Sequence, residues 1–256
     1  ANEIITLYKS LFTSSLEYLM VINSQLSNYT KYCMSKDIVT DHQNHFEEMS
    51  KEVLMECVNR KLLEEKIISK KQMIDYIESS ELKNAVDKYI IQGLFLGLLP
   101  EELVDLRMDN FVGYDIHINN KIIPTNLKFK ENTKKAIEDT EYYIYTENTR
   151  NNIYKLNPED PSPIKVKEGY DIDGTKSAKY QRMSKKLAAL QKNTRYSALT
   201  YKSLRESGRI AMIKELHEET GKTMYECIKD KKISEIYGKV GAVQRYIMKY
   251  RKWLTE

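Results

Sequence analysis

Residues 97–110 read Gly-Leu-Leu-Pro-Glu-Glu-Leu-Val-Asp-Leu-Arg-Met-Asp-Asn. Proline is well placed in the first turn of a helix, where its missing N–H is not needed, so Pro100 marks a helix start. Glu101 and Glu102 follow it, and their negative charges suit the positive end of the helix dipole. The sequence therefore predicts a helix that begins at Pro100 and contributes leucine and valine side chains to a core.

Upstream of this stretch the sequence predicts two more helices. Ser69 stands three residues before Gln72, which is the spacing of a capping box at a helix start. Residues 82–98 are apolar around much of the helix circumference, as is typical of a long and largely buried helix. The chain is therefore expected to be helical on the N-terminal side of the quoted stretch.

Downstream of it the pattern changes to alternation. Residues 114–124 alternate between apolar and polar side chains and are interrupted by Asn119-Asn120. Asparagine tolerates the left-handed conformation that two-residue turns require, so this segment predicts a β-hairpin. Residues 127–129 and 142–145 could add further strands.

The remaining chain divides into an irregular stretch and two helical parts. Residues 148–175 hold three prolines and two glycines and form the only long stretch without a regular pattern. Residues 176–256 are helical again, and residues 1–66 show helical periodicity, including one amphipathic stretch from Phe46 to Leu63. We therefore predict a mainly α fold with a small antiparallel β-sheet, an α+β protein, in two domains, 1–66 and 67–256.

The charge is distributed unevenly along the chain. The 256 residues include only 9 Gly and 5 Pro, which excludes collagen-like and Gly-rich low-complexity proteins, and the net charge is +4. Residues 1–66 carry −3 and residues 67–175 carry −5, whereas residues 176–256 carry 20 Lys and Arg against 8 Asp and Glu, a net +12. Such asymmetry favours a polyanion such as nucleic acid as partner. The alternative is a lysine-rich solvated surface.

Cysteine and histidine usage indicates the compartment and excludes most metal chemistry. Three widely spaced cysteines, Cys33, Cys57 and Cys227, fit a reducing cytosol better than a disulfide framework. No apolar run is long enough to cross a bilayer, and the start lacks the basic region of a signal peptide, so we expect a cytoplasmic protein without a membrane partner. His42-x-x-His45 is only half of a zinc site, so we predict no metal and no cofactor.

The order of these elements resembles the tyrosine recombinase, or phage integrase, family. Residues 97–110 look like its G-L-R-x-x-E-L-x-x-L-x-x-x-D box, and Ser69–Ile77 looks like the helix that opens its catalytic domain. Lys202–Arg205 stands where the family has H-x-L-R, and Gln244–Tyr246 resembles the segment of its nucleophilic tyrosine. The resemblance implies a helical core-binding domain followed by a mostly helical catalytic domain with a small sheet.

The departures from the family pattern imply a degenerate catalytic domain. Leu99 replaces the first arginine that stabilises the phosphate transition state, and a leucine can donate no hydrogen bond. Lys202 replaces a histidine and cannot supply the imidazole's donor. Arg205 and Tyr246 remain, and Lys121 occupies the hairpin where the family has a general-acid lysine. We expect no catalysis, although Arg205, Lys202 and Lys121 could still contact DNA; Tyr246 is one of 19 tyrosines and Arg205 could instead be a structural ion-pair partner.

The helix that family members set into the major groove corresponds in position to residues 176–190, with an N-cap expected at Gly174-Thr175. One face, expected to pack inward, consists of Tyr180, Met183, Leu187 and Leu190. The other face, expected to meet the groove, consists of Lys179, Arg182 and Lys186. Base edges are expected to be read by Lys179, Gln181 and Arg182, and phosphates to be contacted by Lys185, Lys186 and Lys192. The alternative is an ordinary amphipathic surface helix.

These features favour a sequence-specific regulator that binds double-stranded DNA without cutting it. Phage repressors of the SPβ type look like this, with an integrase-like body that occupies operators, which would place the chain in a bacterial cell carrying a prophage or mobile element. Two alternatives remain open: an active divergent recombinase that uses Tyr246, and a protein-interaction scaffold with the N-terminal helices as docking surface. By the same resemblance, the apolar stripe of residues 246–254 could dock on a neighbouring protomer, or it could pack on its own domain.

Overall fold

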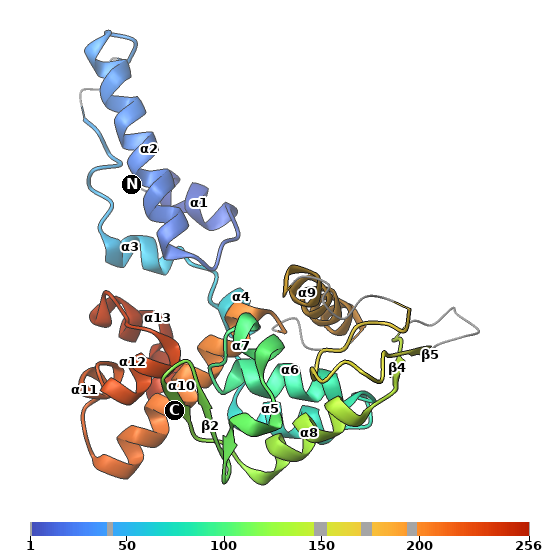
Figure 1. The fold of residues 1–256 in the computed structure, drawn as a ribbon. Helices are drawn as coiled ribbons and strands as arrows, with labels where there is room; N and C mark the ends of the chain where they lie inside the picture. Colours follow the sequence, from blue (N-terminus) through green and yellow to red (C-terminus); the bar gives the residue numbers. More distant parts are fainter. Residues whose placement is uncertain (1, 40–42, 146–152, 170–175, 194–198, 256) are drawn as a thin grey trace. The chain divides into compact units, whose positions relative to one another are not determined.

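The computed structural model describes residues 2–39, 43–145, 153–169, 176–193 and 199–255 (Figure 1). The chain divides into two compact units, Ala1–Glu65 and Lys66–Glu256. Helices dominate both units, and the strands form one three-stranded and one two-stranded antiparallel sheet. The predicted α+β class, mainly helical with small antiparallel sheets, is therefore confirmed.

The described residues of the first unit form four helices, which are α1 (Asn2–Ser10), α2 (Leu16–Ser35), α3 (Lys51–Glu56) and α4 (Arg60–Glu64). Its core is a cluster of buried side chains from α1, α2, α3 and the two residues that follow α3: Tyr8, Leu16, Leu19, Leu54, Cys57 and Val58. The amphipathic stretch expected from about Phe46 to Leu63 is helical only in part and is not continuous. It is divided between α3 and α4, because the Asn59 side chain accepts the Leu62 N–H at 3.2 Å and starts a new helix there.

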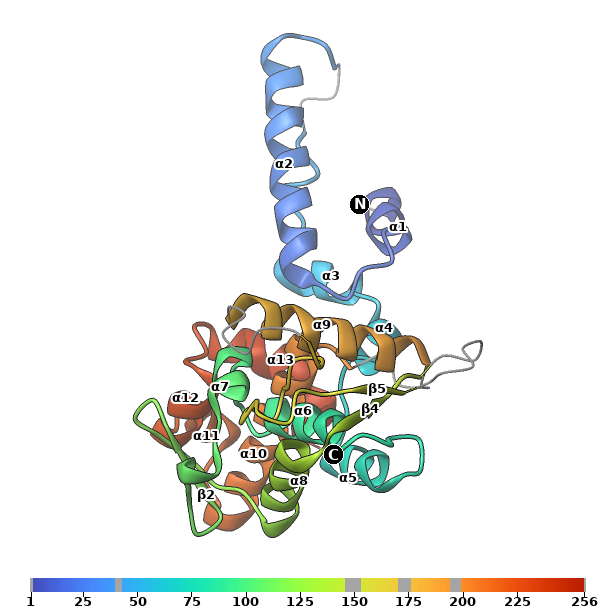
Figure 2. The same cartoon turned by 45° about the vertical axis from the view of Figure 1, so that its right-hand side comes forward.

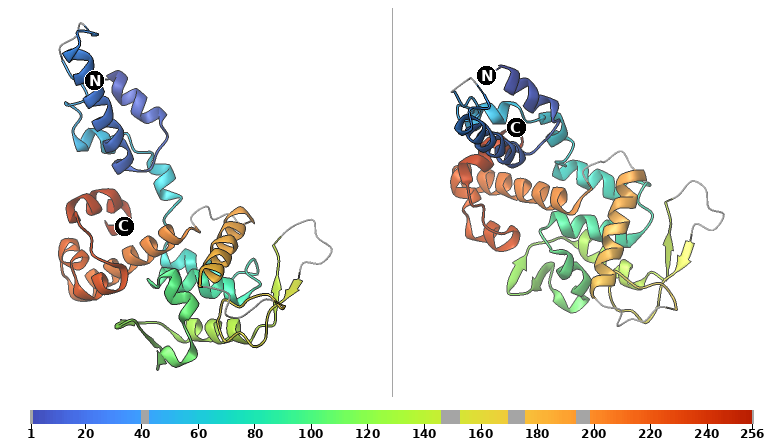
Figure 3. Two further views of the ribbon diagram at one scale, coloured as in Figure 1. Left: turned by 45° about the horizontal axis from the view of Figure 1, so that its top comes forward. Right: turned by 90° about the horizontal axis from the view of Figure 1, so that it is seen from above.

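The second unit is built around the helix α10 (Tyr201–Thr220), which contacts five other helices: α5 (Lys70–Glu78), α6 (Ala85–Phe95), α11 (Met224–Ile228), α12 (Lys231–Tyr237) and α13 (Val243–Thr255). Figure 3 shows α10 running from α6 to the group formed by α11, α12 and α13. The helix α9 (Lys176–Asn193) packs on α6 and on the short helix α7 (Pro100–Asp105), as Figure 2 shows.

Local signals in the sequence account for several element starts. The Ser69 hydroxyl accepts the Gln72 N–H at 3.1 Å and the Gln72 side chain accepts the Ser69 N–H at 2.9 Å, so the capping box is confirmed. The helix α7 begins at Pro100, as predicted. Asn119 and Asn120 have φ angles of 47° and 61° and form the hairpin turn between β2 (Asp115–Ile118) and β3 (Lys121–Ile123).

Strand β1 (Phe111–Val112) pairs with β2 and completes the three-stranded sheet. The sequence did not indicate this third strand. The strand considered at Leu127–Phe129 is wrong, because this segment opens α8 (Leu127–Glu138), where the Asn126 side chain accepts the Phe129 N–H at 3.0 Å. The helix buries Phe129 on its inner face.

The second sheet pairs β4 (Glu141–Tyr143) with β5 (Ile153–Lys155). The strand expected at 142–145 therefore lies one residue earlier and ends at Tyr143. The described part of 148–175 is more regular than expected, because it contains β5 and a loop that buries Asp160 and Ile164 completely or nearly so. The N-cap expected at Gly174-Thr175 lies outside the described residues.

Candidate nucleic-acid interface

The helix α9 turns a different face to solvent from the one that the sequence predicts. Met183, Leu187 and Leu190 are buried as expected. Lys179 and Lys186, expected to face a groove, are only 6% and 8% exposed, whereas Tyr180, expected in the core, is 41% exposed. The predicted orientation of these three side chains is therefore wrong, because partners outside the helix draw both lysines inward.

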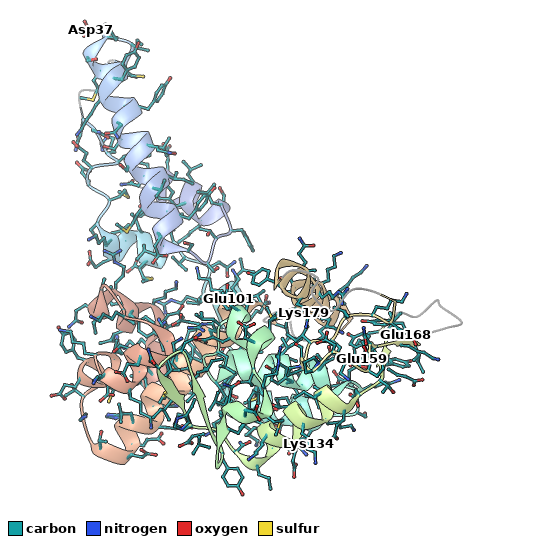
Figure 4. All side chains as sticks on the ribbon, in the orientation of Figure 1. Asp37, Glu101, Lys134, Glu159, Glu168 and Lys179 are labelled. Carbon is teal, nitrogen blue, oxygen red and sulfur yellow. The ribbon has the colours of Figure 1, made fainter. Side chains whose placement is uncertain are left out.

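Lys179 forms a buried ion pair with Asp160 (Figure 4 labels Lys179). Its Nζ lies 2.8 Å from Oδ1 of Asp160, whose side chain is fully buried. The same carboxylate accepts the backbone N–H groups of Ser162 at 3.0 Å and Val166 at 2.8 Å. The ion pair therefore fixes the N-terminal half of α9 to the loop at residues 156–168.

Lys186 anchors the next two turns of α9 to an aromatic and acidic cluster. Its Nζ lies 2.9 Å from the centroid of the Tyr142 ring and 3.5 Å from the Tyr154 hydroxyl. Burial lowers the pKa of Lys186 to about 7, although the negative charge of Asp87 opposes this shift. Burial likewise raises the pKa of Asp87, which accepts the Asn84 amide at 2.7 Å.

Among residues 178–192 of α9, the exposed side chains are neutral up to Ser184 and include two lysines further on. They are Tyr180, Gln181, Ser184, Lys185, Ala188 and Lys192. Arg182 is half-buried and donates to the Lys165 carbonyl at 3.3 Å. Gln181 can present an amide donor and acceptor to a base edge, and the two exposed lysines can approach phosphates.

Leu99, at the position of the missing arginine, is the N-cap residue of α7. The Leu99 N–H donates to Oε2 of Glu102 at 2.7 Å, and the other oxygen of this buried carboxylate accepts Lys121 Nζ at 2.8 Å. Lys121, the lysine expected in the hairpin, therefore lies close to Leu99, but its ammonium group is paired with the carboxylate of Glu102. Asn119, in the hairpin turn, lies 3.4 Å from the same oxygen.

Arg205 is half-buried on α10 and donates to backbone carbonyl groups. Its Nη1 donates to the Gly97 carbonyl and its Nη2 to that of Ile236 at 3.5 Å. The guanidinium also lies 5.9 Å from the centroid of the Tyr237 ring. Arg205 therefore joins the turn before α7 to the end of α12, while Lys202, one helical turn earlier, is exposed.

Tyr246 is 8% exposed, and its ring lies 6.0 Å from the guanidinium carbon of Arg209. Burial raises its pKa well above the usual value, and the negative charge of the neighbouring Glu206 adds to the shift while Arg209 opposes it. A phenol that stays protonated in a closed site is a poor nucleophile. The stripe of α13 packs within its own unit, since Tyr250 and Leu254 are also buried there.

Sequence reasoning missed Glu206 and Arg209 as neighbours of Tyr246. Arg209 stands four residues after Arg205, so helical spacing could have placed both arginines on one side of α10. Asp160 and Asp87 were also missed, and their pairing with α9 rests on contacts between distant segments that leave no local signal.

Among the described residues, no three His, Cys, Asp or Glu side chains gather in a way that could hold a metal ion. His42 lies outside that part of the chain, and His45 pairs with Glu48 at 3.5 Å. Cys33, Cys57 and Cys227 are free and buried. Of the helices that the structure describes, none has the length and apolar character needed to cross a membrane.

Comparison with known proteins identifies the second unit. Residues 67–252 match the model of a family described as MrpR, C-terminal catalytic domain. No curated protein matches the chain. The matched segment covers more than half of the 256 residues and almost all of the unit that contains α9, Arg205 and Tyr246. The chain therefore belongs to the family of the MrpR C-terminal catalytic domain, which is tyrosine-recombinase-like.

Proposed function

We propose that this protein is a sequence-specific double-stranded DNA-binding regulator, a repressor of the prophage type, that occupies its sites without cutting them. The observation that carries the proposal is the state of the recombinase-like centre. Leu99 donates no side-chain hydrogen bond, Lys121 is paired with Glu102, and the Tyr246 hydroxyl is buried beside Glu206. Of the groups that strand cleavage would need, one donor is therefore absent, one lysine is paired with an acid, and the tyrosine hydroxyl is buried.

DNA binding is supported by a different set of side chains. Lys185 and Lys192 are exposed on α9, and Lys202 is exposed at the start of α10. These three cations lie in the segment 176–256, which carries the net charge of +12. We assign phosphate contacts to the three lysines and base reading to Gln181, which precedes Lys185 by one helical turn.

Fluorescence anisotropy with genomic fragments selected by the protein tests the binding half of the proposal. We expect Lys185→Ala, Lys192→Ala and Lys202→Ala each to reduce the slope of log affinity against log salt by about 1, because each removes one phosphate contact. Gln181→Ala should relax the preference at one base position. Lys134→Ala is the matched control, since Lys134 is exposed on α8 in the same unit and should leave the slope unchanged.

Cleavage is tested on the same fragments with a suicide substrate that traps a phosphotyrosyl adduct. We expect none from the native chain, and Tyr246→Phe should bind the fragments as tightly as the native chain does. An adduct that disappears in Tyr246→Phe would instead identify an active recombinase. If none of the three lysine variants changes the slope of log affinity against log salt, the protein is instead a scaffold that does not bind DNA through this face.

A further inference from the structure

A pocket of about 420 Å³ opens in the second unit between α5, α6, α8, α10 and α12, and we call it the α10 pocket. Small-molecule sites in proteins have volumes of about 300–1,000 Å³ and a mostly apolar lining with a few polar groups. The apolar lining of this pocket includes Met73, Phe95, Leu96, Phe129, Ile233 and Ile236. The four residues to which we assign DNA contacts do not line it, so the pocket is a separate candidate site.

The walls of the α10 pocket are fixed to one another at a single backbone group, the carbonyl of Phe95. Gly208 on α10 lies against it so closely that a β-carbon there would be 1.6 Å from the carbonyl oxygen. The same oxygen accepts the Tyr237 hydroxyl at 2.7 Å, which ties the end of α12 to α6. The pocket is therefore preformed, and a ligand has little ordering of the protein to offset.

The floor of the α10 pocket lies well below the protein surface. Phe129, Ile233 and Ile236 are only 1%, 1% and 2% exposed, and Phe95 is 4% exposed. A small molecule can enter such a pocket and cover these side chains, whereas the flat face of another protein cannot reach them. The depth therefore favours a small ligand over a protein partner.

One buried polar side chain, that of Gln92, lines the pocket with half of its hydrogen-bonding capacity unused. Gln92 is 7% exposed, and its Oε1 accepts Asn132 Nδ2 at 2.7 Å. Its Nε2 donates to no group of the described residues. A side-chain amide nitrogen carries two N–H donors, so Gln92 offers a hydrogen bond to an acceptor inside the pocket. A carbonyl oxygen is such an acceptor, and it would replace water there.

The charges around the α10 pocket favour neither an anion nor a cation. Of the described residues, Lys70, Lys232, Glu215 and Glu219 are the charged ones that line it, and their charges cancel. Lys70 and Glu215 also pair with each other. A charged ligand would have to leave water for an apolar interior without a net opposite charge beside it, which is costly. A neutral ligand has no such cost.

We propose that the α10 pocket binds a neutral small molecule that contains an aromatic ring and a carbonyl oxygen. The ring packs against Phe95 and Phe129, because aromatic side chains contribute large apolar area and favour stacked or tilted contacts with other rings. The carbonyl oxygen accepts a hydrogen bond from Gln92 Nε2, which fixes the orientation of the ligand. The proposal does not rest on the proposed function, since it concerns the protein in the absence of DNA.

Fluorescence titration of the whole chain with Prodan tests the location of the site. Prodan is a neutral naphthalene ketone whose emission shifts to shorter wavelength when it leaves water. We expect saturable binding of one Prodan molecule per chain. Leu96→Trp should weaken binding at least about tenfold, because the indole occupies volume that the probe needs in a close-packed site. Leu127→Trp is the matched control, since Leu127 is 53% exposed on α8 and does not line the pocket.

Displacement of Prodan by acetylnaphthalene and by ethylnaphthalene tests the hydrogen bond, because these two molecules differ in the ketone oxygen. Gln92→Leu keeps an apolar side chain of similar size and removes the donor. The ratio of the two Kd values should shift at least about fivefold against the ketone in this variant, which corresponds to the loss of one hydrogen bond. Circular dichroism should show all variants folded.

The proposal is overturned if the native chain does not bind Prodan saturably, or if Leu96→Trp binds it as tightly as Leu127→Trp does. An unchanged ratio of the two Kd values in Gln92→Leu overturns the assigned hydrogen bond and with it the carbonyl ligand. Leu96→Trp retains Gln92, so it decides the location of the site even where Gln92→Leu does not fold.

Discussion

Replacement of Lys179 by methionine should destabilise the second unit by about 3 kcal/mol. The substitution keeps the length of the side chain but leaves the carboxylate of Asp160 buried without its cation, and breaking a buried pair in this way typically costs 3–5 kcal/mol. Lys179 and Asp160 side chains are only 8% and 0% exposed, so water cannot replace the lost partner. The two backbone N–H groups that Asp160 retains place the cost at the low end of this range.

Urea unfolding followed by tryptophan fluorescence measures this loss. Trp253 is the only tryptophan and lies on α13, so its signal reports on the second unit alone. Lys185→Met is the control, because Lys185 is exposed on the same helix and its loss should change the free energy of unfolding by no more than about 0.5 kcal/mol. Asp160→Asn combined with Lys179→Met should be more stable than the sum of the two single losses predicts.

In a DNA-binding assay we expect the opposite order of effects for Lys179 and Lys185. Lys185→Met should reduce the salt slope, whereas Lys179→Met should leave it unchanged as long as the protein remains folded. If Lys179→Met were as stable as the native chain and yet reduced the salt slope, Lys179 would be a surface residue that contacts phosphate. The orientation of α9 argued above would then be wrong.

Three further predictions concern other parts of the second unit. Gly208→Ala should cost about 3 kcal/mol in urea unfolding, because a β-carbon there would collide with the Phe95 carbonyl oxygen. Burial lowers the pKa of Lys186 from 10.5 to about 7. The cost of burying its charged ammonium group therefore reduces the free energy of unfolding in full below pH 7, and this loss is relieved as the pH rises towards 10.5. Native stability should therefore gain on the order of 1 kcal/mol per pH unit between pH 7 and 9 from this group, a gain that Lys186→Met lacks in urea titrations at each pH. Ser69→Ala should cost about 1 kcal/mol in thermal unfolding, because it removes the acceptor of the Gln72 N–H.

The sequence predicts the elements whose signals are local. The Ser69–Gln72 capping box, the proline start of α7 and the Asn119-Asn120 turn each depend on residues that lie within a few positions of one another. Such contacts form wherever the chain adopts the element, so residue type and spacing are sufficient to place them.

The sequence does not predict which face of α9 is turned to solvent, because the helix carries lysines on both sides. Helical periodicity assumes that a lysine faces solvent, but Lys179 and Lys186 find buried partners in Asp160 and in the cluster of Tyr142 and Asp87. These partners come from segments between 19 and 99 residues away, and no short pattern connects them. A three-residue alternating segment such as Leu127-Lys128-Phe129 is likewise too short for periodicity to separate strand from helix.

The central claim is that this protein holds DNA and does not cut it. The most direct measurement incubates the native chain with its selected duplex, dissociates the complex in high salt, and then separates protein and DNA under denaturing conditions. The account predicts that salt releases all of the DNA, that both strands remain intact, and that no DNA stays attached to the protein. A covalent complex, lost in Tyr246→Phe, would contradict it.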